Sequence, residues 1–321
     1  MATSFASVAN IAKRLSGREI GRIVNFSITR MLVVFERLNR NIGDMPAFLA
    51  LVLLLVSLAP SLAAGARASA WAEFREVRVR LLMLEAAPGD TIIRGGIGIR
   101  LQPDYKTYWR SPGDSGVPPV ADLSGSEGIA GFELLFPFPS RFDDGAGGHS
   151  WGYKRDIILP FTARREGNGP IRLKMKLDFA VCGTMCIPLT ADLKLDPGQL
   201  QSDDIVASLQ RAHERLPRVI PSADMMKKIV TRRVPGAEKP SFEIEIRHDG
   251  EDPDFAVFAE AKGYFHVGDA VQKSPGIYRV KLMGRPAPGT GGKFGPVRLT
   301  FGTKNSAYEG VIDLDGLPAA P

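Results

Sequence analysis

The apolar residues of this 321-residue chain recur with a period of two, and this pattern constrains the fold more than any other feature. In residues 171–181 the odd-numbered positions are apolar, and charged residues occupy positions 172, 174, 176 and 178. A strand with this pattern has one face in a core and the other in solvent. Similar stretches at residues 77–84 and 91–101 alternate with turns rich in Gly, Pro and Asp. The sequence therefore predicts an all-β fold of the sandwich or barrel type.

One segment departs from this pattern and divides the chain. Residues 202–216 have helical spacing, with Ser202 as the expected N-cap and Pro217 as the residue that ends the helix. Strand-like stretches return after it. We therefore predict four segments: a leader at residues 1–70, a β-sandwich at 71–198, a helical linker at 199–224 and a second, smaller β-domain at 225–321.

The leader has the composition of an export signal. Arg30, Arg37 and Arg40 precede the apolar residues 46–65, and the small residues Ala68-Ser69-Ala70 follow. This order predicts a secretory signal that is cleaved before Trp71. The mature protein is then expected in an oxidising compartment, the periplasm. An uncleaved membrane anchor is the alternative, although Pro60 interrupts the apolar run.

Charge argues against a nucleic-acid partner. The chain carries 41 Lys and Arg residues against 35 Asp and Glu residues, a net charge of +6. Residues 1–70 contain eight of the basic residues and three of the acidic ones, so the remainder of the chain is almost neutral. Binding to phosphate backbones depends on a basic surface, and the body of this chain offers no such excess.

A short motif, Gly113-Asp114-Ser115-Gly116, is shared with the nucleophile region of chymotrypsin-type serine proteases. In those enzymes the histidine base precedes the serine along the chain. All four histidines of this sequence follow Ser115: His149, His213, His248 and His266. The order excludes that protease class, and we interpret the motif as a turn.

The two cysteines, Cys182 and Cys186, are separated by three residues between two predicted strands. A three-residue hairpin loop containing Gly183 would place them opposite one another, which suits a disulfide. The pair could be a reversible dithiol or a structural staple, which in so short a loop contributes only about 2 kcal/mol. A third possibility is a Cu(I) site that includes Met185. Zinc has little support, because no further cysteine or close histidine pair completes four ligands.

Three segments carry a resemblance to a known family: "LQPDYKTYWRSPGDSGVPP", "HSWGYKRDIILPFTA" with the preceding "FPFPSRF", and "LDFAVCGTMCIPLTADLKL". Together they resemble the N-terminal periplasmic domain of the DsbD family of thiol:disulfide interchange proteins, including its ScsB-like branch. The resemblance covers residues 77–195. It implies an immunoglobulin-like sandwich whose cysteine pair relays electrons, a component of a protein-disulfide reductase that needs no cofactor.

The resemblance also implies the partners. A membrane electron carrier, acting through a thioredoxin-like domain, would reduce the pair, and periplasmic proteins with disulfides would be its clients. Neither a membrane domain nor a thioredoxin domain is recognisable in this sequence, so we expect both to act in trans. The competing hypothesis is a non-enzymatic periplasmic module that binds a partner protein or copper and keeps a structural disulfide.

Departures from the family pattern concern the active site. The C-x₃-C spacing is narrower than in the best-known members and resembles the ScsB-like branch. The phenylalanine of the family's covering loop has no clear equivalent. Candidates to shield the sulfurs or contact the partner are His149, Trp151 and Tyr153, with Tyr108 and Trp109 as weaker ones.

The resemblance assigns the attacking sulfur to the second cysteine, Cys186, and the resolving role to Cys182. Local sequence agrees with this assignment. Cys182 ends an apolar strand and should be more buried, which disfavours its thiolate. Cys186 is followed by Ile187-Pro188, and a proline without an N–H group suits an edge strand that a partner can approach.

Overall fold

The computed structural model describes residues 65–317 except for Pro88, 144–147, Gln199, Ser202, Glu238, 249–252, Lys262 and Gly316. The predicted export signal, apart from its last residues, and the proposed N-cap Ser202 lie outside the described residues. Within the described part of the chain, no helix is both long and apolar enough to cross a membrane.

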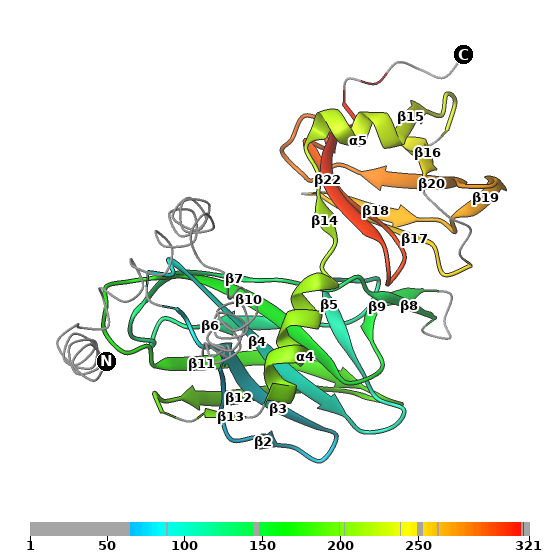
Figure 1. The fold of residues 1–321 in the computed structure, drawn as a ribbon. Coiled ribbons are helices and arrows are strands. Elements are labelled where there is room, and N and C mark those ends of the chain that lie inside the picture. Colours follow the sequence, from blue (N-terminus) through cyan, green and yellow to red (C-terminus); the bar gives the residue numbers. More distant parts are fainter. Residues whose placement is uncertain are drawn as a thin grey trace, which may run out of the picture. The chain divides into compact units, whose positions relative to one another are not determined.

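The first half of the described chain forms a sandwich of two sheets (Figure 1). One sheet has the strand order β13-β1-β3-β4-β10-β7, and β2 pairs with the N-terminal part of β3. Its strands are β1 (Ala66–Ala68), β2 (Ala72–Glu73), β3 (Val77–Leu84), β4 (Ile92–Leu101), β7 (Ile129–Leu134), β10 (Ile157–Arg165) and β13 (Leu200–Gln201).

The other sheet has the order β12-β11-β5-β9-β8, and β6 pairs with β11. Its strands are β5 (Lys106–Gly113), β6 (Val120–Asp122), β8 (Ser140–Asp143), β9 (His149–Tyr153), β11 (Leu173–Cys182) and β12 (Cys186–Leu195). Because β12 pairs only with β11, it is an edge strand of this sheet.

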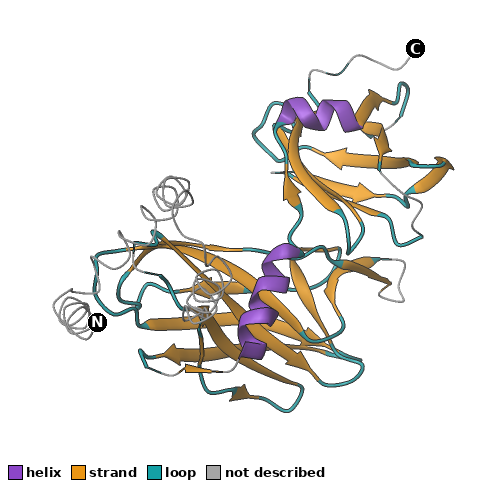
Figure 2. Ribbon diagram, in the orientation of Figure 1, coloured by secondary structure: helices purple, strands orange, loops and turns teal. Residues whose placement is uncertain are grey.

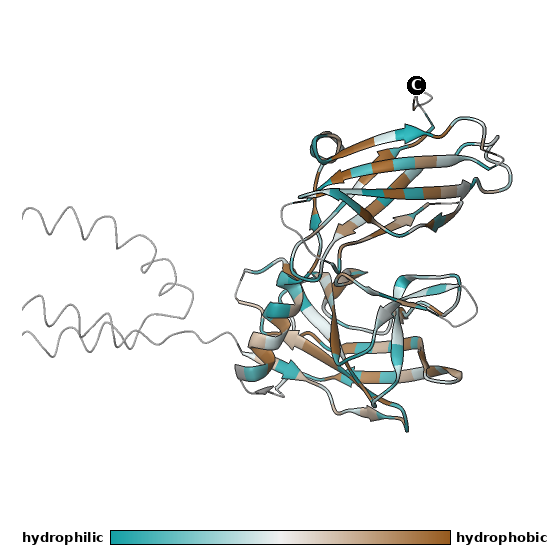
Figure 3. Ribbon diagram, turned by 90° about the vertical axis from the view of Figure 1, so that its right-hand side faces the viewer, coloured by the Kyte–Doolittle hydropathy of each residue, from teal (hydrophilic) through white to brown (hydrophobic). Residues whose placement is uncertain are grey.

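The predicted alternation is confirmed in both sheets and appears in Figure 3 as apolar and polar bands along the strands. In β11 the odd-numbered side chains from Leu173 to Val181 are buried, and Lys174, Lys176 and Asp178 are exposed. Strand β4 shows why its glycines are required. A Cβ atom at Gly95 would lie 2.2 Å from the ring of Phe161, so a side chain there would displace the core.

Helix α4 (Asp203–Glu214) lies against β1, β3 and β10 of the first sandwich (Figures 1 and 2). Its side chains Ile205 and Leu209 are buried in a small cluster with Ala66 and Leu82. The apolar stripe that predicted a linker helix therefore packs onto the sandwich, and the helix is part of that unit. His213, near its end, is half-buried, and its Nε2 lies 3.3 Å from the carbonyl oxygen of Gly95.

A second, smaller sandwich follows, so the predicted all-β class with two β-domains is confirmed. One sheet has the order β14-β22-β21-β17, and the other has β15-β16-β20-β18 with β19 on β20. The elements are β14 (Arg218–Val219), α5 (Ser222–Lys228), β15 (Ile229–Arg233), β16 (Ser241–Arg247), β17 (Ala256–Glu260), β18 (Tyr264–Val267), β19 (Val271–Ser274), β20 (Ile277–Arg285), β21 (Pro296–Gly302) and β22 (Ala307–Asp313). Since β14 pairs with β22, this sandwich includes residues before the expected start at 225.

Strand β1 bears on the expected cleavage before Trp71. Ala66 and Ala68 are buried, and Ala66 pairs with Leu84 of β3. The Arg67 side chain is also buried and donates from Nη1 to the carbonyl oxygen of Ile171, 3.3 Å away. Cleavage at that position would remove a paired strand of the sandwich. The leader boundary at residue 70 stays a prediction, and a cut before Ala66 would leave this strand in place.

Candidate functional site

The two cysteines form a disulfide across the tip of the β11–β12 hairpin. They are directly opposite in the strand register, with Cα atoms 4.1 Å apart. Gly183, Thr184 and Met185 form the loop between them, and the N–H of Gly183 donates to the carbonyl oxygen of Met185 at 3.2 Å. The predicted three-residue hairpin loop and disulfide are therefore both present.

The two sulfur-bearing residues differ in their access to solvent, as the sequence predicted. Cys182 is buried, with 2% of its surface exposed, whereas Cys186 is exposed. Next to Cys186, Met185 is 72% exposed, so an apolar side chain stands beside the accessible sulfur. Pro188 is also exposed on the edge strand β12. A partner can therefore approach Cys186 along this edge without displacing a neighbouring strand.

Tyr108 of β5 lies beneath the disulfide and contacts both sulfurs. Its hydroxyl oxygen is 2.5 Å from Sγ of Cys182 and 3.2 Å from Sγ of Cys186. Disulfide sulfurs carry no hydrogen, so the hydroxyl group is the donor in this state. The side chain is buried, and this burial raises the pKa of Tyr108 above its ordinary value. The hydroxyl group therefore keeps its proton at neutral pH and remains a donor.

The backbone around Tyr108 fixes the position of its ring. Strand β5 pairs with β11, and the Thr107 hydroxyl donates to the carbonyl oxygen of Ala180 at 2.9 Å. On the other side Gly116 packs directly on the ring. A Cβ atom there would lie 2.3 Å from Tyr108 Cε1, and the φ of +125° also favours glycine. The Gly113–Gly116 turn is thus part of the wall around Tyr108, consistent with its interpretation as a turn.

The other predicted shielding residues lie elsewhere. Nδ1 of His149 is 2.8 Å from Asp143, and Trp109, Trp151 and Tyr153 are buried in the core. The ring centroids of Trp109 and Trp151 are 6.2 Å apart, and the Tyr153 hydroxyl donates to the carbonyl oxygen of Pro137. Of the five candidates, Tyr108 alone contacts the sulfurs within the described part of the chain. The shielding and partner-contact roles of the five residues stay predictions.

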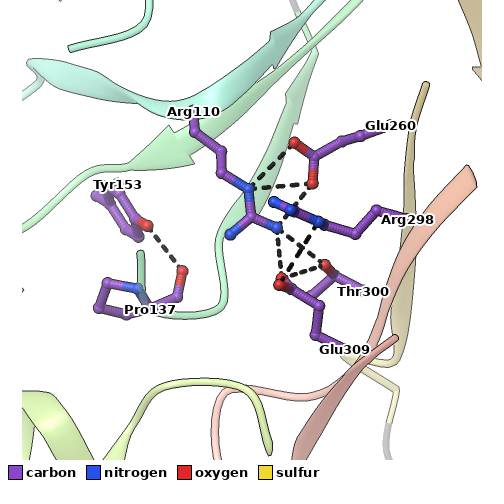
Figure 4. A network of polar contacts seen from close by, with 7 residues as sticks. All are labelled: Arg110, Pro137, Tyr153, Glu260, Arg298, Thr300 and Glu309. Atoms are coloured by element: carbon purple, nitrogen blue, oxygen red, sulfur yellow. Dashed lines mark hydrogen bonds and ion pairs between the residues drawn. The ribbon is translucent and has the colours of Figure 1, made fainter. Parts of the chain in front are cut away.

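Sequence reasoning missed Arg110, two residues after Tyr108 on β5 (Figure 4). Its guanidinium donates to Glu260 through Nε at 3.1 Å and through Nη2 at 2.7 Å, and it also pairs with Glu309. Burial alone would lower the pKa of Arg110, but the bonds to Glu260 and the charge of Glu309 outweigh it and raise the pKa. No local sequence signal links residues 150 or more positions apart, so only the fold reveals this network.

Trp109 adds an apolar contact to the same second sandwich. Its ring centroid lies 5.3 Å from that of Phe258, and Phe258 also contacts Phe138 and Trp151. Strand β5 therefore touches the disulfide with one residue and the second sandwich with the next two. Among the described residues, no group of three or more His, Cys, Asp and Glu side chains is arranged to hold a metal ion.

Comparison with known proteins agrees with this geometry. No curated protein sequence matches the chain. Among solved structures, the N-terminal periplasmic domain of ScsB from Proteus mirabilis matches with a TM-score of 0.62 and 16% identity, over 79% of this chain and 99% of that one. At this identity the likeness concerns the fold. Residues 79–197 match the family described as "Thiol:disulfide interchange protein DsbD, N-terminal". This segment, which contains both cysteines and Tyr108, is a member of the DsbD N-terminal domain family.

Proposed function

We propose that this protein is a periplasmic thiol–disulfide exchange protein that relays electrons through Cys182 and Cys186. One observation carries the proposal: the disulfide spans the tip of an edge hairpin, where Cys186 is exposed and Cys182 is buried against the Tyr108 hydroxyl group. A staple that only stabilises the hairpin has no need of an accessible sulfur or of a buried donor at the other one. Family membership of residues 79–197 supports the same chemistry.

The reduction can be written with these residues. A thiolate of a thioredoxin-like partner attacks Sγ of the exposed Cys186, a partner–Cys186 disulfide forms, and the Cys182–Cys186 bond breaks. Cys182 leaves as a thiolate beside the Tyr108 hydroxyl group, whose hydrogen bond stabilises the new negative charge. The partner's second thiolate then attacks the partner's first sulfur in the mixed disulfide. The partner's own disulfide forms, and Cys186 is released as a thiolate. Two electrons have moved from the partner, which becomes a disulfide, to this dithiol.

Transfer to a client protein repeats these steps in reverse order. The Cys186 thiolate attacks a client disulfide and releases one client thiolate, and Cys182 then attacks Cys186 to release the second. The client gains two electrons, and the Cys182–Cys186 disulfide forms again. Strand pairing holds the two cysteines opposite one another throughout. The resolving sulfur is therefore close when the mixed disulfide forms, which limits the lifetime of that intermediate.

The test is a redox titration of the purified protein. After equilibration with glutathione or a thioredoxin-like dithiol, maleimide labelling should rise by two thiols per chain and fall again on reoxidation. Circular dichroism checks that the fold is retained in both states. A disulfide that resists the thioredoxin-like reductant in the folded protein would identify a staple. Stoichiometric Cu(I) retained by the reduced protein, and lost in Met185→Leu, would instead identify a copper-binding module.

A further inference from the structure

A second site lies on the first sandwich, away from the residues of the disulfide site. A cavity of about 360 Å³ opens between helix α4 and the strands β3, β4 and β10. This volume is in the range of small-molecule sites. Its lining includes Trp71, four arginines (Arg80, Arg100, Arg211 and Arg215) and two aspartates (Asp156 and Asp204). The lining thus carries two more positive than negative charges.

One wall is an indole ring surrounded by guanidinium groups. The Cζ atoms of Arg80, Arg100 and Arg78 lie 4.4, 5.0 and 5.3 Å from the centroid of the Trp71 ring. The π-electrons of the ring attract each cation, which partly offsets the repulsion between them. Three cations around one ring remain an accumulation of like charge that an anion would relieve.

Arg80 is the most constrained of these cations. Its Nε is buried and has no hydrogen-bond partner among the described residues. Burial lowers the pKa of Arg80, and the positive charges of Arg100 and Arg78 lower it further. A buried guanidinium donor without a partner costs free energy, and protein structures avoid it. Since Nε is closed to solvent, an anion in the cavity would act on the positive charge of this guanidinium group rather than bond to Nε.

The nearby carboxylates do not neutralise the group. Asp156 is 3.7 Å from Nε of Arg100 and Glu73 is 3.9 Å from Nη1 of Arg78, and these side chains are exposed, so both ion pairs are weak. The opposite wall has Arg211 on α4 and Arg215 just after the end of that helix, and Nη2 of Arg211 donates to the Ser208 hydroxyl group at 3.2 Å. Cationic groups therefore face the cavity from both of its walls.

The floor of the cavity is apolar, with contributions from Leu82, Ile99, Ile158 and Ile205. Gly98 adds no side chain. A bare inorganic ion would leave this floor uncovered, whereas a small organic anion can place its carbon atoms there and its charge among the arginines. Planar guanidinium groups match the two oxygens of a carboxylate or phosphate group.

We propose that this cavity binds a small organic anion through a carboxylate or phosphate oxyanion that Arg80 and Arg100 hold beside Trp71, with Arg215 on the facing wall. The site shares no residue with the cysteine hairpin and Tyr108. Binding therefore does not depend on thiol–disulfide exchange, and Cys182→Ser/Cys186→Ser protein should bind with unchanged affinity.

Tryptophan fluorescence of the purified full chain provides the assay. Of the three tryptophans, Trp109 and Trp151 are buried in the core, so Trp71 is the one that a ligand in this cavity can reach. Phosphate, glycerol 3-phosphate, succinate and citrate are titrated at constant ionic strength, with chloride as the reference anion. We expect a saturable change with at least one oxyanion, and its absence in Trp71→Phe. Preference for the phosphates or the carboxylates then identifies the ligand class.

Three variants complete the test. Arg80→Gln and Arg215→Gln should each weaken binding at least tenfold, because each removes a charge-assisted bond. Arg215 is exposed in the turn after α4, so its variant should fold even if Arg80→Gln does not. Arg232→Gln, an exposed arginine of β15, is the matched control and should bind as the unchanged protein does. Absence of saturable binding with every oxyanion, or equal affinity in Arg215→Gln and Arg232→Gln, would overturn the proposal.

Discussion

The hydroxyl group of Tyr108 donates to the buried sulfur of Cys182, 2.5 Å away, from the strand next to the hairpin. This relationship places a neutral donor where a thiolate forms when the disulfide is reduced. Stabilisation of this thiolate needs no helix N-terminus or charged side chain, because a hydrogen bond to a charged group contributes about 1.5–3 kcal/mol by itself.

Replacing Tyr108 by Phe should slow cleavage of the Cys182–Cys186 disulfide by an attacking thiolate at neutral pH. The ring is kept and the donor is lost, so the thiolate is less stable and its fraction falls. This thiolate is the one that Cys182 becomes when the disulfide is cleaved, so we expect reduction of the disulfide by a thioredoxin-like dithiol to slow by about tenfold, the rate equivalent of about 1.4 kcal/mol. Tyr105→Phe is the control, since the Tyr105 ring lies against Gly183 and, within the described part of the chain, the tyrosine hydroxyl group bonded to the sulfurs is that of Tyr108. Equal rates in the two variants would remove Tyr108 from the mechanism.

Single cysteine variants should separate the attacking sulfur from the resolving one. Cys182→Ser leaves the exposed Cys186, so a mixed disulfide with a thioredoxin-like partner should accumulate because nothing resolves it. Cys186→Ser leaves the buried Cys182, which the partner cannot reach, and should trap little. Non-reducing gel electrophoresis followed by mass spectrometry measures both. The opposite trapping pattern would exchange the two roles.

Acid should destabilise the first sandwich through His213. Burial, followed by the charge of Arg94, lowers the pKa of His213 below its usual 6.5, so the folded state keeps the imidazole neutral. As the pH falls through 6.5 the unfolded chain binds the proton first, and the free energy of unfolding decreases. Above 6.5 the contribution is fully present. Urea unfolding at pH 7.5 and 5.5 should therefore show a smaller loss of stability in His213→Gln than in the unchanged protein; identical losses would contradict this.

Arg110→Met should destabilise the protein by about 1.5–3 kcal/mol, because Glu260 and Glu309 would be left close together without their shared cation. Thermal unfolding measures the effect. Arg298→Met is the matched control: its side chain is half exposed, its Nε is 3.8 Å from Glu309, and the expected change is below about 1 kcal/mol. Equal losses in the two variants would show that the Arg110 network contributes no more than a surface ion pair.

The exported protein should retain residues 66–68. Removal of β1 would uncover the Leu82 side of the sandwich and delete Arg67, which also pairs with Glu85 at 3.1 Å. N-terminal sequencing of exported protein should therefore find a start before Ala66, for which Ser61-Leu62-Ala63 offers small residues at suitable spacing. Protein produced from Trp71 onward should unfold at a lower temperature than protein produced from Ala64. A natural start at Trp71 would restore the boundary predicted from sequence.

Period-two patterning and turn residues predicted the sandwiches because each strand's burial depends on its own alternation. The cysteine hairpin could be predicted in the same way, because its two strands are adjacent in the sequence and the short loop fixes their register. The burial of Cys182 and the exposure of Cys186 are confirmed. The docking of α4 was missed, although its apolar residues Ile205 and Leu209 already required a partner surface.

The contact of Tyr108 with the sulfurs could not be predicted, because it depends on which strand pairs with β11. The period-two pattern did not single out β5, and its pairing of Thr107 with Val181 comes only from the fold. Arg110 shows the same limit more strongly, because its carboxylate partners come from two separate strands of the second sandwich. Long-range pairing has no local signature, so these contacts could not be predicted.

The contacts of strand β5 affect the choice of boundaries for a fragment of this protein. The family match ends at residue 197, before α4 and before the strands that carry Phe258, Glu260 and Glu309. A fragment cut at the limits of the match would present Trp109 and Arg110 to water from the same strand that holds Tyr108 at the sulfurs. The segment that the family match covers is therefore shorter than the part of the chain that packs around β5, and a change of behaviour at the cysteines in such a fragment would report a damaged β5.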